Sequence, residues 1–147
     1  MASEEKIVLY PIGYVKSKYV NEGNRDIISQ IVIKNELIET LQGIEDFSHI
    51  FVLFYFDRIS PEKKSTLKLH PKGRADLPLV GTLGSRSMLH PNPIGVTLVE
   101  IIKVEGNILT VKGLDAYDGT PVLDIKPYDP EGDAAVNAKV PDWWNKL

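Results

Sequence analysis

The amino-acid sequence predicts a mostly β, single-domain β-barrel with short helices and a basic loop or small lobe. Two observations lead to this prediction: many short runs of β-branched and aromatic residues are separated by Gly, Pro and Asn turns, and only one short stretch has a helical pattern. The 147 residues, of which 43% are hydrophobic and 25% charged, have the size and composition of one soluble domain. We therefore expect residues 1–147 to form one barrel domain that ends in a tail over residues 134–147.

The first third of the chain is expected to contain two strands and one helix. Residues 6–16 are β-branched and aromatic but include Pro11, which is typical of an edge or bulged strand. The apolar triplet within residues 27–34 predicts the second strand. Asn35 is of a type that caps helices, so we expect it to cap a short helix ending at Leu41.

The strongest strand pattern covers residues 49–59, and a basic stretch follows it. The sequence HIFVLFYFDRI is almost continuously apolar, which predicts a strand buried on both faces. Residues 60–76 are polar and interrupted by Pro and Gly, and loops of this length within a compact domain are usually functional. Seven basic and two acidic side chains between residues 58 and 90 give this region a charge of +5, whereas the whole chain carries −3. The charge favours a polyanionic ligand, although a solvated lysine-rich loop has the same composition.

The most constrained backbone lies over residues 89–94, with the sequence LHPNPI. Pro91 and Pro93 fix their own φ angles and exclude the residues before them from the α region. We therefore expect an extended, stiff ribbon that presents polar groups at little entropic cost, as a preorganised binding site requires. A connector that only stabilises the fold is the alternative.

The C-terminal half is expected to contain a hairpin and one further short strand. Residues 96–104 and 108–114 are two strand-like runs joined by Glu-Gly-Asn, and residues 121–125 form the last run. A polar turn over residues 115–121 brings together two carboxylates, a phenol and a hydroxyl. The pair Trp143-Trp144 must be covered, either by the body of the protein or by a second subunit.

Several classes of function are excluded by what the sequence lacks. The chain contains no cysteine, so it has no disulfide, thiolate nucleophile or cysteine zinc site. The three histidines, His49, His70 and His90, do not have the spacing of a metal motif, and we expect no metal. No nucleophile elbow, dinucleotide fingerprint or P-loop occurs. No apolar run reaches the roughly 20 residues of a membrane span, and the acidic N-terminus is unlike a signal peptide, so we expect a cytoplasmic protein without membrane contact.

Two stretches, taken together, resemble the TsaA-like (TrmO) family of S-adenosylmethionine-dependent tRNA methyltransferases. The first is RSMLHPNPIG over residues 86–95, and the second is LDAYDGTPVLDIKPY over residues 114–128. Ser48-His49 and Ile12-Gly13 fit the same pattern, so the resemblance covers about residues 11–130. It implies a homodimeric barrel that binds S-adenosyl-L-methionine and methylates the exocyclic nitrogen of threonylcarbamoyl-adenosine beside the anticodon of tRNA.

The resemblance also implies which residues contact the cofactor. They lie in an early loop, at the end of the long strand, in the Arg-Ser motif, just after Pro-Ile-Gly and in the Asp-Gly-Thr-Pro turn. In this chain they are Arg25, Asp57, Arg58, Arg86, Val96, Asp118, Gly119, Thr120 and Pro121. Asn92, whose amide the stiff ribbon would present, completes the set. An ion pair of Arg86 with Asp118 that only holds the barrel together is the structural alternative for Arg86.

Two further sets of residues are expected to act on the RNA. His90 and Tyr117 are candidates, by residue type alone, to take the proton from the acceptor nitrogen. Basic side chains of the 60–76 stretch are expected to meet phosphates of the anticodon stem-loop, and these are Lys63, Lys64, Lys68, Lys72 and Arg74.

The chain departs from the family pattern at several of these positions. His90 replaces the usual Arg before Pro-Asn-Pro, Met88 replaces a Pro, and Leu83 replaces a Phe. Asp57-Arg58 stands where a His-Gln pair usually ends the long strand. The departures leave two alternatives open: the same cofactor with a small-molecule acceptor, or a non-catalytic barrel that binds RNA or senses a ligand.

Overall fold

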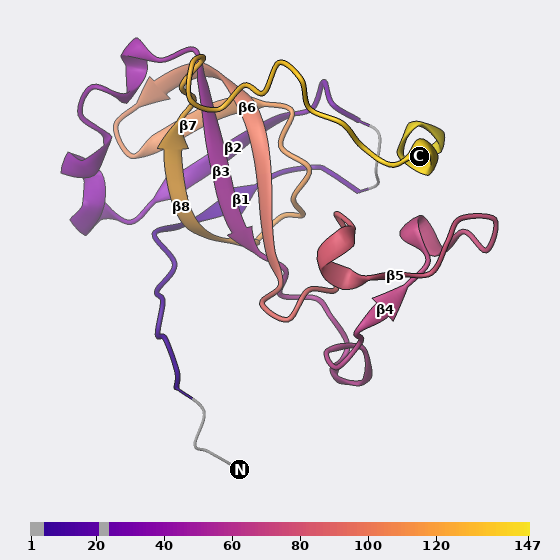
Figure 1. The fold of residues 1–147 in the computed structure, drawn as a ribbon. Coiled ribbons are helices and arrows are strands. Elements are labelled where there is room, and N and C mark those ends of the chain that lie inside the picture. Colours follow the sequence, from indigo (N-terminus) through magenta and orange to yellow (C-terminus); the bar gives the residue numbers. More distant parts are fainter. Residues whose placement is uncertain (1–4, 21–23) are drawn as a thin grey trace.

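Six strands close into an antiparallel barrel in the computed structural model, which describes residues 5–20 and 24–147 (Figure 1). The strands are β1 Gly13–Lys16, β2 Ile28–Ile33, β3 His49–Tyr55, β6 Ile94–Glu105, β7 Ile108–Lys112 and β8 Pro121–Pro127. Their order around the barrel is β1-β2-β7-β6-β3-β8, and every neighbouring pair is antiparallel. The predicted mostly β barrel is therefore confirmed, and its closure leaves the strands without a long open edge.

Burial along β3 alternates instead of being continuous. Ile50, Val52 and Phe54 point into the barrel and are at most 2% exposed, whereas the residues between them are only partly buried. The prediction of burial on both faces was wrong. A barrel strand has one face in the core, and here the outer face is covered only locally, as where Phe51 meets the ring of Tyr128 at 5.8 Å.

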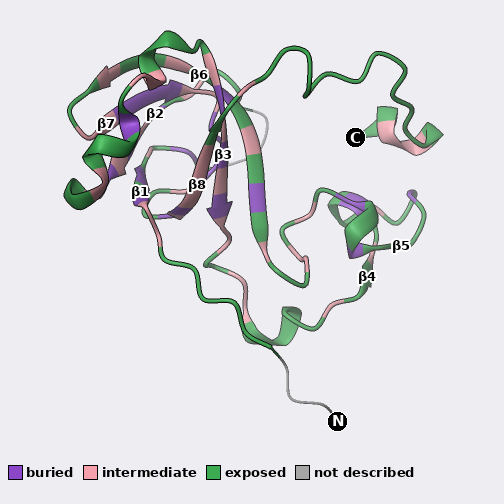
Figure 2. Cartoon of the chain, turned by 60° about the vertical axis from the view of Figure 1, so that its left-hand side comes forward, coloured by how far each residue is buried: buried purple, intermediate pink, exposed green. Residues whose placement is uncertain are grey.

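The barrel interior is filled by apolar side chains, and two glycines allow close approach within it (Figure 2). A Cβ on Gly95 would lie 2.5 Å from the ring of Phe54, which is its partner across β3 and β6. A Cβ on Gly13 would lie 2.3 Å from the backbone oxygen of Val32. Both glycines are therefore required by packing, because no other residue fits without displacing a neighbour.

The N-terminal elements are shorter and tighter than expected. Of the predicted strand over residues 6–16, only Gly13–Lys16 is a strand. Backbone hydrogen bonding reaches one residue further, to Ile12, and stops at Pro11, which has no N–H to donate. The predicted helix is the 3₁₀ helix η1 Asn35–Leu41, and a second 3₁₀ turn, η2 Ile44–Asp46, follows. The prediction that Asn35 caps this helix was wrong: Lys34 occupies the cap, and the Asn35 amide oxygen accepts a hydrogen bond from Asn107 at 3.2 Å.

Residues 60–84 form a small lobe beside the barrel, which we call the basic lobe (Figure 1). It contains η3 Pro61–Lys63, β4 Lys68–Leu69, η4 Pro71–Gly73, β5 Val80–Gly81 and η5 Thr82–Gly84. Strands β4 and β5 pair with each other and not with the barrel. Leu77 is buried and provides an apolar centre for the lobe. The basic stretch is thus folded, as expected for a small lobe.

The chain ends in an extended strap and one short helical turn. Every residue from 129 to 142 is exposed, and η6 Asp142–Lys146 then lies beside the basic lobe (Figures 1 and 2). Arg74 of the lobe donates a hydrogen bond from Nη1 to the carbonyl of Lys146, which ties the strap to the lobe. We call residues 128–147 the tail from here on; they include the tail predicted over residues 134–147. Within the described ranges, the structure has no helix with the length and hydrophobicity needed to cross a bilayer.

Candidate functional site

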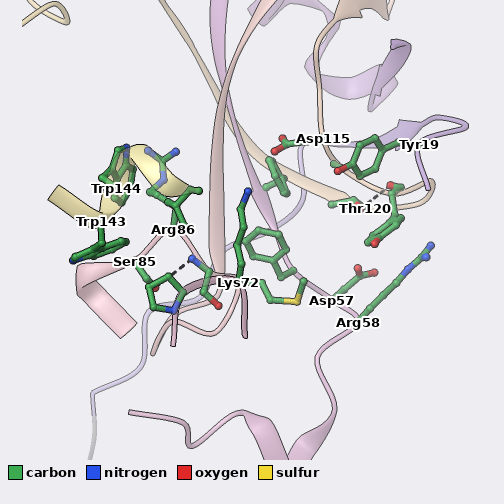
Figure 3. A pocket seen from close by; sticks show the side chains of 18 residues that line it. Tyr19, Asp57, Arg58, Lys72, Ser85, Arg86, Asp115, Thr120, Trp143 and Trp144 are labelled. Atoms are coloured by element: carbon green, nitrogen blue, oxygen red, sulfur yellow. Dashed lines mark hydrogen bonds between the residues drawn. The ribbon is translucent and has the colours of Figure 1, made fainter. Parts of the chain in front are cut away.

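A cleft lies where the rim of the barrel, the basic lobe and the tail meet (Figure 3). It has a narrow chamber of about 270 Å³ and a wide chamber of about 880 Å³. The two chambers share a wall that includes Phe56, Lys72, Arg86, Asp115 and Trp144. Two joined chambers suit a reaction between two ligands, because each can hold one ligand while the shared wall faces both.

Arg58 and two tyrosines form one side of the narrow chamber. Arg58 donates a hydrogen bond from Nη2 to the carbonyl of Asp118 at 2.7 Å, and its guanidinium lies 4.9 Å from the ring centroid of Tyr117. The Tyr117 ring in turn lies 5.5 Å from that of Tyr19. The Arg58–Tyr117 stack fixes the planar guanidinium at the mouth of the chamber, where it can donate to a carboxylate.

The polar turn predicted over residues 115–121 forms one edge of the same chamber. Thr120 lines the chamber, and its hydroxyl donates to the carbonyl of Tyr117 at 2.7 Å. The Asp118 carboxylate accepts a hydrogen bond from the backbone N–H of Ser17 at 3.0 Å, and Gly119 has a φ of 84°. Asp118 and Gly119 therefore hold the shape of the turn, and neither they nor Pro121 line either chamber.

Arg86 and Val96, two of the predicted cofactor contacts, come together beside the wide chamber. Arg86 donates a hydrogen bond from Nη2 to the carbonyl of Val96 at 3.0 Å and lines both chambers. The alternative ion pair with Asp118 is not formed: Arg86 bonds to the Val96 carbonyl, and the Asp118 carboxylate accepts from the N–H of Ser17. Arg25 lines the wide chamber together with Val96. The structure thus gathers the early loop, the Arg-Ser motif and the residue after Pro-Ile-Gly around one space.

The Pro-Asn-Pro segment is bent, whereas an extended ribbon was predicted. The N–H of His90 donates to the carbonyl of Met88 at 3.0 Å, and that of Ile94 donates to the carbonyl of Asn92 at 2.7 Å. Each of these hydrogen bonds spans two residues and closes a tight turn. Pro91 and Pro93, which have no N–H group, cannot donate such bonds themselves. Asn92 is exposed and lies outside both chambers.

His90 lines the wide chamber and has a defined tautomer. Its Nε2 lies 3.0 Å from the carbonyl oxygen of Ser85, and a carbonyl only accepts, so Nε2 carries the proton. In the neutral imidazole, Nδ1 then has no proton and is able to accept one. Tyr117, the other candidate, lies in the narrow chamber instead.

The predicted RNA-binding residues fall into three groups. Lys63, Lys64 and Lys68 are exposed on the lobe, whereas Lys72 lines both chambers. Lys72 has a φ of 53°, an uncommon backbone conformation for a residue other than glycine and one that is enriched at functional sites. Arg74 is paired with the Asp76 carboxylate at 2.6 Å in addition to its bond to the tail. This hydrogen bond from Arg74 holds the pKa of Asp76 below its usual value, so the pair stays charged at neutral pH.

The largest part of the site that sequence reasoning missed is the tail. Trp143, Trp144 and Leu147 line the narrow chamber, and Trp144 and Leu147 also line the wide one. Figure 3 shows the two tryptophans and Arg86 on one side of the chamber, with Tyr19 and Thr120 on the other. The sequence clue to this wall was the pair of adjacent tryptophans, because two large apolar rings are rarely left fully exposed to solvent.

Other missed residues belong to the barrel rim and to the segment before Pro91. They are Tyr19, Phe54, Phe56, Ser85, Ser87, Met88 and Asp115. Asp115 accepts a hydrogen bond from the Thr97 hydroxyl, which orients the carboxylate within the shared wall. The part of the chain that the structure describes contains no group of three or more His, Cys, Asp or Glu side chains that could hold a metal ion.

This arrangement defines a β-barrel domain whose rim carries a cleft of mixed charge, with the size of a site for small organic ligands. Residues 19–134 match the family model described as the tRNA-methyltransferase O N-terminal domain, and the chain belongs to this family. The resemblance to the TsaA-like (TrmO) family is thereby confirmed.

Known proteins with similar sequences and structures agree with this assignment. The chain is 41% identical over 134 residues to a protein of Archaeoglobus fulgidus named "S-adenosyl-L-methionine-binding protein", covering 86% of this chain and 93% of the relative. It is 39% identical over 109 residues to the human tRNA (adenine(37)-N6)-methyltransferase, covering 74% of this chain and 24% of the relative. The crystal structure of TrmO from P. aeruginosa is similar, with a TM-score of 0.76 and 27% identity over 95% of this chain. This chain spans 62% of the length of that solved chain.

Proposed function

We propose that this protein is a cytoplasmic S-adenosyl-L-methionine-dependent tRNA N-methyltransferase whose acceptor is the exocyclic nitrogen of threonylcarbamoyl-adenosine beside the anticodon. The observation that carries the proposal is the pair of joined chambers lined by the family motifs and flanked by a basic lobe. The names of the relatives support the cofactor and the class of acceptor. The threonylcarbamoyl group and the anticodon position are what the resemblance to the family implies.

The residues of the cleft fit the functional groups of this cofactor. Arg58, Arg86 and Lys72 are cations suited to its carboxylate, and Asp57 and Asp115 are carboxylates suited to its amino group. The rings of Tyr19 and Tyr117 in the narrow chamber offer faces for the adenine and for the positive sulfonium. When bound, the cofactor would supply an electrophilic methyl group, so that the protein mainly has to align donor and acceptor.

The acceptor nitrogen must lose a proton when it is alkylated, and the chain offers two groups to receive it. We favour Nδ1 of His90, because its Nε2 is already committed to the Ser85 carbonyl and the ring faces the wide chamber. Tyr117 serves this role instead if the acceptor enters the narrow chamber.

The decisive experiment incubates the purified protein with cofactor and with tRNA that contains threonylcarbamoyl-adenosine but lacks its N6-methyl group. Nucleoside mass spectrometry is expected to detect N6-methylated threonylcarbamoyl-adenosine. Calorimetric binding of the cofactor without any tRNA methylation would point to a small-molecule acceptor. Absence of cofactor binding would leave a non-catalytic barrel, and the proposal would fail.

We expect the exposed lysines of the basic lobe to contact RNA phosphates. Replacing Lys63, Lys64 and Lys68 by Gln is expected to weaken tRNA binding and to lower the slope of log K against log salt by about three, one per phosphate contact. Cofactor affinity should stay unchanged, because these side chains lie outside both chambers. Filter binding over a range of salt concentrations measures the slope.

The matched control replaces three lysines of the barrel by Gln, and so removes the same amount of charge. These lysines are Lys103, Lys112 and Lys126. These lysines pair with Glu105, Asp26 and Asp124, so they are already neutralised by neighbours. Equal losses of RNA affinity in the two triple variants would mean that net charge, and not the lobe, attracts the RNA.

We also propose a homodimer, because an apolar strip on β6 faces outward. Ile102 is 47% exposed and lies outside both chambers, whereas Val96 and Leu98, which are 39% and 42% exposed, also line the wide chamber, as does Leu83 of the lobe. Light scattering at micromolar concentration is expected to give the mass of two 16.4 kDa chains. Ile102→Lys should shift the equilibrium to the monomer, whereas Val136→Lys on the exposed strap should not. A wild-type monomer would contradict this prediction.

A further inference from the structure

We propose that Trp144 is a specificity-determining residue on which the acceptor purine base stacks during methyl transfer. The inference deepens the proposed function and rests on it. It starts from the position of this side chain: Trp144 lines both chambers, whereas Trp143 lines only the narrow one. Trp144 therefore belongs to the wall at which two ligands would meet.

An exposed strap carries the aromatic end of the tail to the cleft. All residues from 129 to 142 are exposed, and the tryptophans are the first residues beyond them that are partly buried. Their rings lie 5.6 Å apart and tilted by 53°, and the bond from Arg74 to the Lys146 carbonyl fixes the turn that carries them. An exposed strap contributes little packing, so the placement of the tail depends on this bond and on the contacts of its aromatic end with the cleft.

The charge of the wide chamber indicates which ligand approaches this side of Trp144. Arg25, Lys72 and Arg86 line it against a single carboxylate, Asp115. The narrow chamber instead sets three cations against two carboxylates, which suits a zwitterionic ligand. A polyanion is attracted to the more positive space. The base that reaches Trp144 from the wide chamber is therefore that of the RNA.

Stacking supplies what an enzyme acting on a base needs. A nucleobase that reacts at its exocyclic nitrogen has to leave its stacked position, and an aromatic side chain replaces the lost stacking partner. Trp144 presents a large rigid face for this purpose. Loss of such a stacking face weakens binding of single-stranded nucleic acid by about tenfold to a hundredfold.

The two tryptophans of the chain both lie in the tail, so tryptophan fluorescence, excited at a wavelength that tyrosine does not absorb, reports on this segment alone. In Trp143→Phe, Trp144 is the only tryptophan. A synthetic anticodon stem-loop that contains threonylcarbamoyl-adenosine is expected to quench it, and the same stem-loop with an abasic site at that position is expected to bind without quenching. S-adenosylhomocysteine alone should leave the emission unchanged. Equal quenching by the abasic RNA, or quenching by S-adenosylhomocysteine alone, would overturn the inference.

Kinetics provide the second test. Trp144→Ala is expected to raise the KM for the stem-loop about tenfold to a hundredfold and to leave the Kd for S-adenosylhomocysteine unchanged. Trp144→Phe, which keeps an aromatic face, is expected to recover most of the lost affinity for the stem-loop. Val136→Ala, a fully exposed position on the same strap, is the control. Wild-type KM in Trp144→Ala would overturn the stacking role while leaving the methyltransferase proposal intact. No methylation by the wild-type protein would instead be a failure of the proposed function.

Discussion

Arg86→Ala is expected to weaken binding of S-adenosyl-L-methionine about tenfold to a hundredfold, which corresponds to roughly 1.5–3 kcal/mol for a lost charge-assisted hydrogen bond. Arg86 lies in the shared wall, and its bond to the Val96 carbonyl fixes the side chain at the junction of the two chambers. A guanidinium has five N–H donors, and this bond uses one of them. The remaining donors suit the carboxylate of the cofactor.

Isothermal titration calorimetry with S-adenosylhomocysteine measures the effect. Arg86→Lys should recover only part of the affinity, because an ammonium cannot bond to the Val96 carbonyl and to a carboxylate in the same planar geometry. Lys103→Ala removes a cation on the barrel and should leave the affinity unchanged. A lower melting temperature, with affinity reduced only in proportion to the folded fraction, would show that Arg86 merely ties its loop to β6.

The barrel and the motif turns could be predicted because their signals are local. Runs such as residues 28–33 alternate in burial, and Gly106 adopts a φ of 60° in the hairpin as its sequence suggests. The interior orientation of β3 could not be predicted from its composition. Its outer residues are as apolar as its inner ones, so the period-two pattern is invisible until the barrel closes.

The distinction between scaffold and ligand contact in the motif turn was also beyond the sequence. Asp118, a predicted cofactor contact, gives its carboxylate to the N–H of Ser17, which is 101 residues away in the chain. The motif has a carboxylate at this position whether Asp118 holds the turn in shape or contacts the cofactor. Only the fold reveals that Thr120 faces the chamber while Asp118 faces the neighbouring loop.

The tail was the part of the site furthest from prediction. Its position depends on the Arg74–Lys146 bond, which joins residues 72 positions apart, and on a lobe whose own strands have only two residues each. Arg74 was predicted to meet phosphate because it is basic. In the structure its guanidinium is bonded to the Asp76 carboxylate and to the carbonyl of Lys146 in the tail, and no pattern of spacing encodes that geometry.

Gly95→Ala is expected to lower the free energy of unfolding by about 1–3 kcal/mol, the usual cost of overpacking a core. The new methyl group would meet Cε2 and Cζ of Phe54 at 2.5 Å. The Phe54 ring is 2% exposed and packs edge-on against Phe56 at 5.2 Å, and both rings line the cleft. We therefore expect the displaced ring to reduce cofactor affinity as well as stability.

Gly13→Ala separates these two effects. Its methyl group would meet the backbone oxygen of Val32, which cannot move without breaking the pairing of β1 with β2, so the loss of stability should exceed that of Gly95→Ala. Gly13 does not line the cleft, and affinity should fall only with the folded fraction. Adding Phe54→Leu to Gly95→Ala shrinks the obstructing ring and should restore part of the stability. Thermal unfolding followed by circular dichroism measures the stability, and calorimetry on the folded proteins measures the cofactor affinity. Unchanged affinity in Gly95→Ala would mean that the Phe54 ring does not shape the ligand site.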